Sequence, residues 1–138
     1  MSDKLAENDA WILLALLLSA RKKEPVALVD VIANADYLNH AIPTLGELDE
    51  ACFRLSKSGW IVGTVEDLSP SEKAKRMYDG RKDYEGPTIS HWDFVNGKIG
   101  AKGWRSHLKK DDPTVCKFPG LHQKDYDEAC EAYLKRQN

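Results

Sequence analysis

The sequence predicts a mainly helical α+β fold, and three observations carry this prediction. The run 11–20, WILLALLLSA, is apolar at nearly every helical position, which is typical of a buried helix. Residues 44–57 place leucines at helical spacing behind a helix-capping pattern. Residues 60–65, WIVGTV, have the β-branched and aromatic composition of a strand. With 138 residues, the chain can hold one domain with a core and an appendage.

We expect the first helix to cover about residues 8–21, with Asn8 or Asp9 as its N-cap. The apolar run is about half the length of a membrane span. Residues 1–9 carry three acidic side chains against Lys4, whereas a secretory leader begins with positive charge. We therefore expect a cytoplasmic protein without a membrane segment. A helix that is apolar on all sides needs cover on several faces, so we expect a homodimer through this helix or through the C-terminal one.

The next elements follow from turn and capping signals. Pro25 opens a second helix, whose apolar face continues from Val26 to about residue 38. Thr44 and Glu47 form a capping-box pattern for a third helix over 44–57. The buried stripe of this helix should consist of Leu45, Leu48, Cys52 and Leu55.

Gly59 should end the third helix in a left-handed conformation. A strand then follows, with a short return strand ending near Leu68. Ser69 and Pro70 are typical of the cap and first position of a further helix, which Gly80 closes.

The stretch TLGELDEACFRLSKSGWIVGTVEDLSPSEK resembles the second half of MarR-like and PadR-like winged helix-turn-helix domains. The resemblance rests on the pattern from Leu55 to Trp60, a wing at 61–67, and the turn Leu68-Ser69-Pro70. With the two preceding helices it covers about residues 8–79, and it implies a winged-helix domain at 1–80 in a DNA-binding protein of the transcriptional-regulator type. The wing departs from the family because it is short and carries two acids and no Lys or Arg.

In such a domain the third helix enters the major groove. Its outward positions are expected to be Gly46, Glu47, Asp49, Glu50, Phe53, Arg54 and Lys57. The candidate DNA contacts are Thr44, Arg54, Lys57, Lys73 and Arg76. Acids near a polyanion are unfavourable, so an alternative stays open: a winged-helix module that binds a basic protein surface through an acidic third helix. The resemblance places DNA binding first.

Residues 81–138 form a predicted extension that resembles no known family. An Asn96-Gly97 pair predicts a hairpin over about 88–104, in which Trp92 and Trp104 face each other across the strands. A terminal helix is expected over about 121–136, with one side formed by Tyr126, Ala129, Cys130, Tyr133 and Leu134. The net charge is −4 for residues 1–80 and +2 for 81–138.

The stretch 98–110, KIGAKGWRSHLKK, is the second candidate site for nucleic acid. It holds cations around a tryptophan and no acid, a composition that suits phosphate contact and base stacking. Its candidate contacts are Lys98, Lys102 and Arg105. A solvated surface segment is the competing interpretation.

No catalytic, metal or cofactor site is predicted. The three cysteines, Cys52, Cys116 and Cys130, are widely spaced, which favours reduced thiols over a disulfide framework. The four histidines are scattered, so they do not have zinc-ligand spacing. The adjacent residues of SHWD, 90–93, do not make a catalytic triad, because triads combine distant positions in a specific geometry.

Overall fold

A computed structural model describes residues 4–83, 86–104 and 115–137. It is mainly helical, with one small two-stranded antiparallel sheet, so the predicted α+β class is confirmed. The order of the helices and strands is α1 (Glu7–Ala20), α2 (Leu28–Asn39), α3 (Leu45–Lys57), β1 (Ile61–Val62), β2 (Ser69–Pro70), α4 (Glu72–Asp79), α5 (His91–Ile99) and α6 (Gln123–Arg136). Short 3-10 turns η1 (Val65–Asp67), η2 (Gly80–Asp83) and η3 (Thr88–Ser90) connect them.

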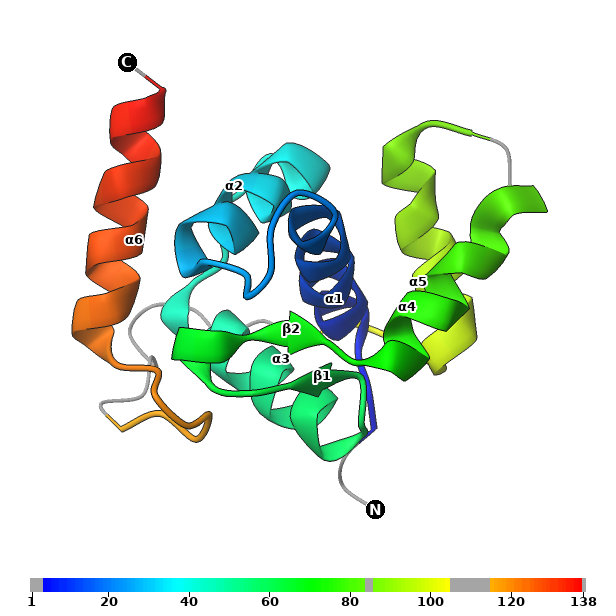
Figure 1. Cartoon of the computed structure of the whole chain (residues 1–138), viewed down its shortest axis with the longest axis horizontal. Coiled ribbons are helices and arrows are strands. Elements are labelled where there is room, and N and C mark those ends of the chain that lie inside the picture. Colours follow the sequence, from blue (N-terminus) through cyan, green and yellow to red (C-terminus); the bar gives the residue numbers. More distant parts are fainter. Residues whose placement is uncertain (1–3, 84–85, 105–114, 138) are drawn as a thin grey trace.

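Helix α1 lies in the middle of the molecule, between α2 and the pair α4 and α5 (Figure 1). Every residue from Trp11 to Leu17 is buried, as the apolar run predicts. The cover comes from α2, α3, α4, α5 and β2 of the same chain. The reason for expecting a dimer through this helix therefore does not hold. Among the described residues, no helix is long and apolar enough to cross a membrane.

Helix α3 forms as its sequence predicts. Thr44 Oγ1 accepts a hydrogen bond from the Glu47 amide at 3.1 Å, and Glu47 Oε1 accepts one from the Thr44 amide at 3.0 Å. These two bonds satisfy donors that a helix start leaves without an intrahelical partner. The stripe Leu45, Leu48, Cys52 and Leu55 is buried. Burial raises the pKa of the Cys52 thiol to about 12, which makes this thiol unreactive at neutral pH.

The hairpin is shorter than predicted. Its register pairs Ile61 with Pro70, and an isolated antiparallel bridge joins Leu68 to Val26, in the connection between α1 and α2. The prediction that Ser69 and Pro70 start the following helix is wrong. Ser71 is the cap of α4, and its hydroxyl accepts from the Ala74 amide at 3.2 Å. Because Pro70 is paired with β1, the helix can begin only after it.

The hairpin predicted over 88–104 is also wrong, because residues 91–99 form helix α5. The Asn96-Gly97 pair lies inside this helix, which ends at Gly100 with a φ of +73°. Val95 is fully buried, and Trp92 Nε1 donates to the Glu7 carbonyl at 2.9 Å. Packing against α1 therefore favours the helix over the turn that the Asn-Gly pair predicts.

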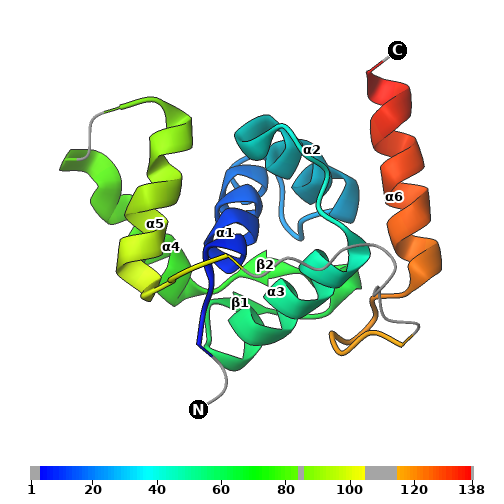
Figure 2. The same cartoon turned by 180° about the vertical axis from the view of Figure 1, so that it is seen from behind.

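Helix α6 stands beside α2 at one edge of the molecule (Figures 1 and 2). Ala129 and Tyr133 are buried as predicted, whereas Leu134 is half-exposed and does not belong to the packed side. The Tyr126 hydroxyl donates to the Pro43 carbonyl at 2.7 Å. Further contacts to α2 come from Tyr133 with Asp36 and from Arg136 with Asp30. The buried core thus continues from residues 1–80 into the extension.

Candidate functional site

The acidic side chains of α3 are all engaged within the molecule. Glu47 is part of the helix cap and also accepts from Asn8 Nδ2 at 3.5 Å. Asp49 is fully buried, contrary to the prediction that it faces outward, and so is Gly46. Glu50 pairs with Arg54 Nη1 at 3.0 Å and with Lys117 Nζ at 2.8 Å. The acidity of this helix therefore has a structural explanation.

Arg54 was a predicted DNA contact, but its side chain is only 7% exposed. Its Nε donates to Asp9 Oδ2 at 2.8 Å, and its Nη2 donates to Asp9 Oδ1 at 2.9 Å. This is a two-bond, fork-like pair with a carboxylate that is itself 0% exposed. The same carboxylate accepts from the Ala6 amide at 2.9 Å. Arg54 thus ties α3 to α1 and is not presented to a phosphate.

Residues 115–121, called here the covering segment, lie over α3. Asp49 accepts from the Lys117 amide at 3.0 Å and from the Phe118 amide at 2.8 Å. Phe118 and Leu121 are buried in the core cluster. The Pro119 carbonyl accepts from the Val65 amide in η1 at 3.4 Å. The covering segment therefore bridges α3 and the loop of the hairpin, which are the two surfaces that a winged helix presents to DNA.

The remaining predicted contacts are spread over the molecule. Thr44 caps α3, and Arg105 lies outside the described residues. Lys98 lies near the end of α5, and Lys102 follows it. Lys57 lies over the ring of Phe53, and Lys73 lies over the ring of Trp60. Lys73 also donates to the Ser58 carbonyl at 3.0 Å. Arg76 is exposed on α4.

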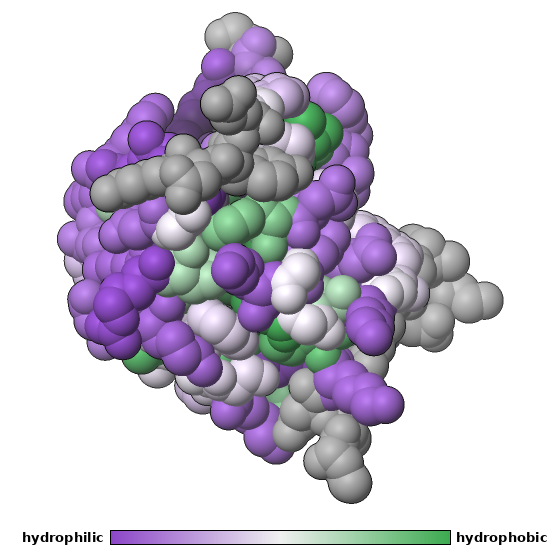
Figure 3. All heavy atoms as spheres, turned by 90° about the vertical axis from the view of Figure 1, so that its right-hand side faces the viewer, coloured by the Kyte–Doolittle hydropathy of each residue, from purple (hydrophilic) through white to green (hydrophobic). Residues whose placement is uncertain are grey.

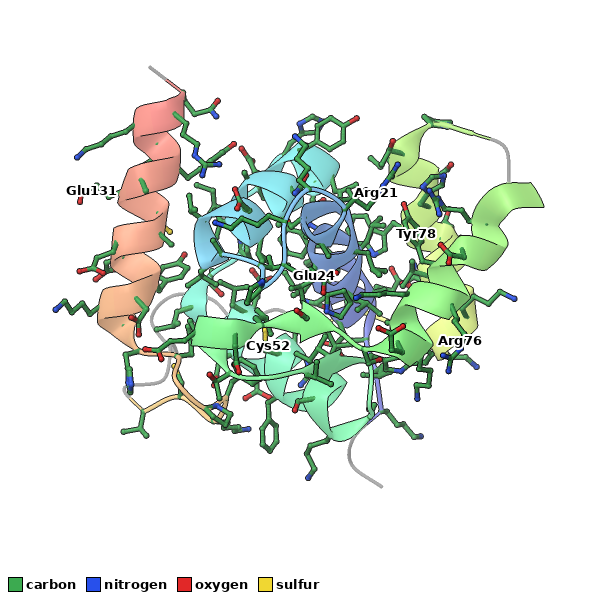
Figure 4. All side chains as sticks on the ribbon, viewed as in Figure 1. Arg21, Glu24, Cys52, Arg76, Tyr78 and Glu131 are labelled. Carbon is green, nitrogen blue, oxygen red and sulfur yellow. The ribbon has the colours of Figure 1, made fainter. Side chains whose placement is uncertain are left out.

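A cavity of about 270 Å³ lies where the end of α1 meets β2 and α4. Figure 4 shows Arg21, Glu24 and Tyr78 around this junction. The cavity is lined by Leu17, Ala20, Arg21, Glu24, Pro70, Lys75, Tyr78, Asp79 and Arg81. The sequence does not predict this cavity, because its lining residues come from two stretches far apart in the chain, 17–24 and 70–81. The one local signal is the spacing of Ala74 and Tyr78, which places Tyr78 on the buried face of α4.

Charged groups gather at this cavity. Arg81 places its guanidinium carbon 4.0 Å from the centre of the Tyr78 ring and donates from Nη1 to the Tyr78 carbonyl at 3.0 Å. Lys75 pairs with Glu24 at 2.9 Å. The Tyr78 hydroxyl shares a hydrogen bond of 3.0 Å with His91 Nδ1.

The protonation of Tyr78 and His91 follows from these surroundings. Burial raises the pKa of Tyr78, while the positive charges of Arg81 and Arg21 act in the opposite direction. Burial lowers the pKa of His91, and the same two arginines lower it further. At neutral pH the phenol and the imidazole are therefore both uncharged, and the positive charge of the site lies on the arginines.

We expect acid to destabilise the wild-type chain more than a His91→Gln variant. The folded-state pKa of His91 lies below its ordinary value of 6.5, so the unfolded chain takes up the proton first. The stabilisation is complete above the unfolded pKa and is lost as pH falls through the folded pKa. Urea denaturation at about pH 7.5 and about pH 5.5 measures this difference. A His122→Gln variant, at an exposed position, should keep the wild-type pH dependence, and the same behaviour in His91→Gln would contradict the prediction.

Comparison with known proteins does not identify a family. No protein-family model matches the chain, and neither a curated protein nor a solved structure does.

Proposed function

We propose that this chain is a winged-helix module for protein–protein interaction that does not read DNA with α3. The order of three helices, a hairpin and a further helix supports the winged-helix assignment. The bridge between Val26 and Leu68 adds a third short extended segment beside the hairpin. The proposal that α3 does not read DNA depends on one observation: the buried Asp49 holds the covering segment on α3.

Duplex recognition requires side chains of the groove helix at base edges and cations at phosphates. Here the covering segment lies on the outward side of α3, Arg54 is bound to Asp9, and the exposed cation of α3 is Lys57. To bring this side of α3 into a DNA groove, the covering segment would have to leave it. That movement would break the bonds to Asp49 and expose Phe118. The alternative of a DNA-binding regulator therefore needs a rearrangement with a large free-energy cost.

The partner surface that we propose lies at the C-terminal end of α1, beside α2. A second hollow, of about 390 Å³, is lined by Leu18, Arg21, Lys22, Asn34, Tyr37 and Thr88. Tyr37 is 63% exposed, so it offers an aromatic anchor at the rim. Among the described residues, two cations line the hollow and no acid does, so charge complementarity selects an acidic protein segment with an apolar side chain. The basic partner expected from sequence is not supported, because the acids of α3 are bound internally.

On the side of the molecule formed by α4 and α5, hydrophobic areas are small and separated by hydrophilic side chains (Figure 3). That face does not show one broad apolar patch of the kind that marks a large interface. A partner on this side would contact hydrophobic and hydrophilic side chains in alternation. We therefore place the proposed contact at the hollow beside α2.

Fluorescence anisotropy with two labelled ligands tests the proposal. A random-sequence duplex should show no saturable binding at about 50 mM salt, where phosphate contacts of a DNA-binding protein are strong. A peptide with one phenylalanine among glutamates should bind the full chain and lose about tenfold in affinity when Lys22 is changed to Glu or Tyr37 to Ser.

The control is a Lys57→Glu variant, which should leave peptide binding unchanged. Duplex binding that falls steeply with salt and is weakened by Lys57→Glu would overturn the proposal in favour of a DNA-binding regulator. Equal binding of a lysine-containing peptide would remove the proposed charge selectivity.

A further inference from the structure

We infer that the cavity at the junction of α1, β2 and α4 binds a small aliphatic monocarboxylate. This inference goes beyond the proposed function and does not depend on it, because the cavity and the proposed partner hollow share only Arg21 among their lining residues. Three properties of the cavity lead to it, namely its size, its apolar wall and its balance of charges.

The size and the wall fit a short hydrocarbon chain. The volume of about 270 Å³ is near the lower end of the range for small-molecule sites. Leu17, Ala20 and Pro70 supply an aliphatic wall, and Leu17 and Pro70 are buried. A ligand with a few methylene groups would cover this wall and remove apolar surface from water.

The charge of the lining selects a single negative charge. Three cations, Arg21, Lys75 and Arg81, face two acids, Glu24 and Asp79, so the lining residues that the structure describes have a net charge of +1. Lys75 is paired with Glu24 at 2.9 Å. The surplus positive charge therefore lies with the two arginines, and Asp79 disfavours a dianion such as phosphate.

The two arginines act at the same end of the cavity. The guanidinium group of Arg81 stacks on Tyr78, and both Arg21 and Arg81 act electrostatically on Tyr78 and His91. The bond from Arg81 to the Tyr78 carbonyl fixes the guanidinium and uses one of its five N–H donors. A planar guanidinium matches the two oxygens of a carboxylate. The acid group of the ligand is therefore placed at Arg21 and Arg81, with its chain along Leu17 and Pro70.

An NMR titration of the full chain with hexanoate, acetate, hexanamide and inorganic phosphate tests the inference. Hexanoate should give saturable shifts at residues that line the cavity. It should bind at least tenfold more tightly than acetate, because each buried methylene contributes to affinity. It should also bind at least tenfold more tightly than hexanamide, which has no charge, and than phosphate, which carries more than one. The reason is that the two arginines select a ligand with a single negative charge.

Matched variants complete the test. Arg81→Gln should weaken hexanoate binding at least tenfold. Arg76→Gln, which changes an exposed arginine of the preceding helix α4, should not. Arg21→Gln, at an exposed position, gives a second test that keeps the stacking of Arg81 on Tyr78. Equal binding of hexanoate and hexanamide, a preference for phosphate, or wild-type affinity in both Arg81→Gln and Arg21→Gln would overturn the inference. The partner peptide should still bind Arg81→Gln, so failure here is distinct from failure of the proposed interaction module.

Discussion

Replacing Asp9 with asparagine is expected to lower the free energy of unfolding by about 3–5 kcal/mol, because it removes the two-bond counter-charge of a buried guanidinium and leaves only its pair with the partly exposed Glu50. Both oxygens of Asp9 accept from Arg54, and the two side chains are 0% and 7% exposed. A buried cation that loses its main partner keeps its cost of leaving water, and the single bond from Arg54 to Glu50 offsets only part of that cost. Urea denaturation followed by circular dichroism measures the change.

Asp30 provides a matched control for this substitution. It also pairs with an arginine, Arg136, at 3.0 Å, but the two side chains are 38% and 50% exposed. Asp30→Asn should therefore cost less than about 1 kcal/mol. Replacing both members of the buried pair, as Asp9→Leu with Arg54→Met, should recover much of the stability that Asp9→Asn loses. A stability of Asp9→Asn equal to that of Asp30→Asn would show that the pair does not hold α1 and α3 together.

The second large effect is expected at Asp49, which holds the covering segment. Asp49→Ala leaves the amides of Lys117 and Phe118 without their acceptor. We expect a loss of about 2–4 kcal/mol, since unsatisfied buried donors cost about 1–3 kcal/mol each. Hydrogen exchange adds a local measurement, because the two amides should lose protection as the covering segment leaves α3.

Asp67 is the control here, because it accepts from the Thr64 amide at 2.7 Å but lies at the surface. Asp67→Ala should cost no more than about 1 kcal/mol. If the amides of Lys117 and Phe118 stay protected in Asp49→Ala, the carboxylate is not what holds the covering segment, and the argument against DNA reading by α3 loses its main support.

The parts of the fold that depend on neighbouring residues could be predicted from the sequence. The cap formed by Thr44 and Glu47 is a local signal, and so is the stripe that follows it, which is why the bounds of α3 agree with the prediction. The all-round apolar character of residues 11–17 similarly identified the central helix. In these segments local preference and tertiary packing agree.

Prediction failed where distant residues decide the outcome. Asn96 and Gly97 favour a turn locally, but the contacts of Trp92 and Val95 with α1 stabilise a helix. The predicted contact between Trp92 and Trp104 is present, with ring centres 6.1 Å apart, but not as a cross-strand pair, because residues 91–99 form a helix.

The candidate site was harder to predict than the fold. Arg54 was assigned to an outward face, and no helical periodicity could show that Asp9, 45 positions earlier, lies opposite it. Likewise, nothing near Asp49 indicates that amides 68 and 69 positions later bind its carboxylate. The sequence therefore predicts Arg54 and Asp49 of α3 at the surface, whereas both side chains are buried and bind other parts of the chain.

The central position of α1 also has a consequence for synthesis on the ribosome. Trp11 packs against Trp92 and Trp104, so its side of α1 stays uncovered until Trp104 has been added, 84 residues after Ala20. At roughly 5–20 residues per second this takes about 4–17 s. Hydrophobic collapse takes only microseconds. The apolar side of α1 in the nascent chain therefore stays exposed to water for much longer than a hydrophobic association requires. The order of the elements along the chain thus leaves the nascent protein open to aggregation until residues 91–104 have been made.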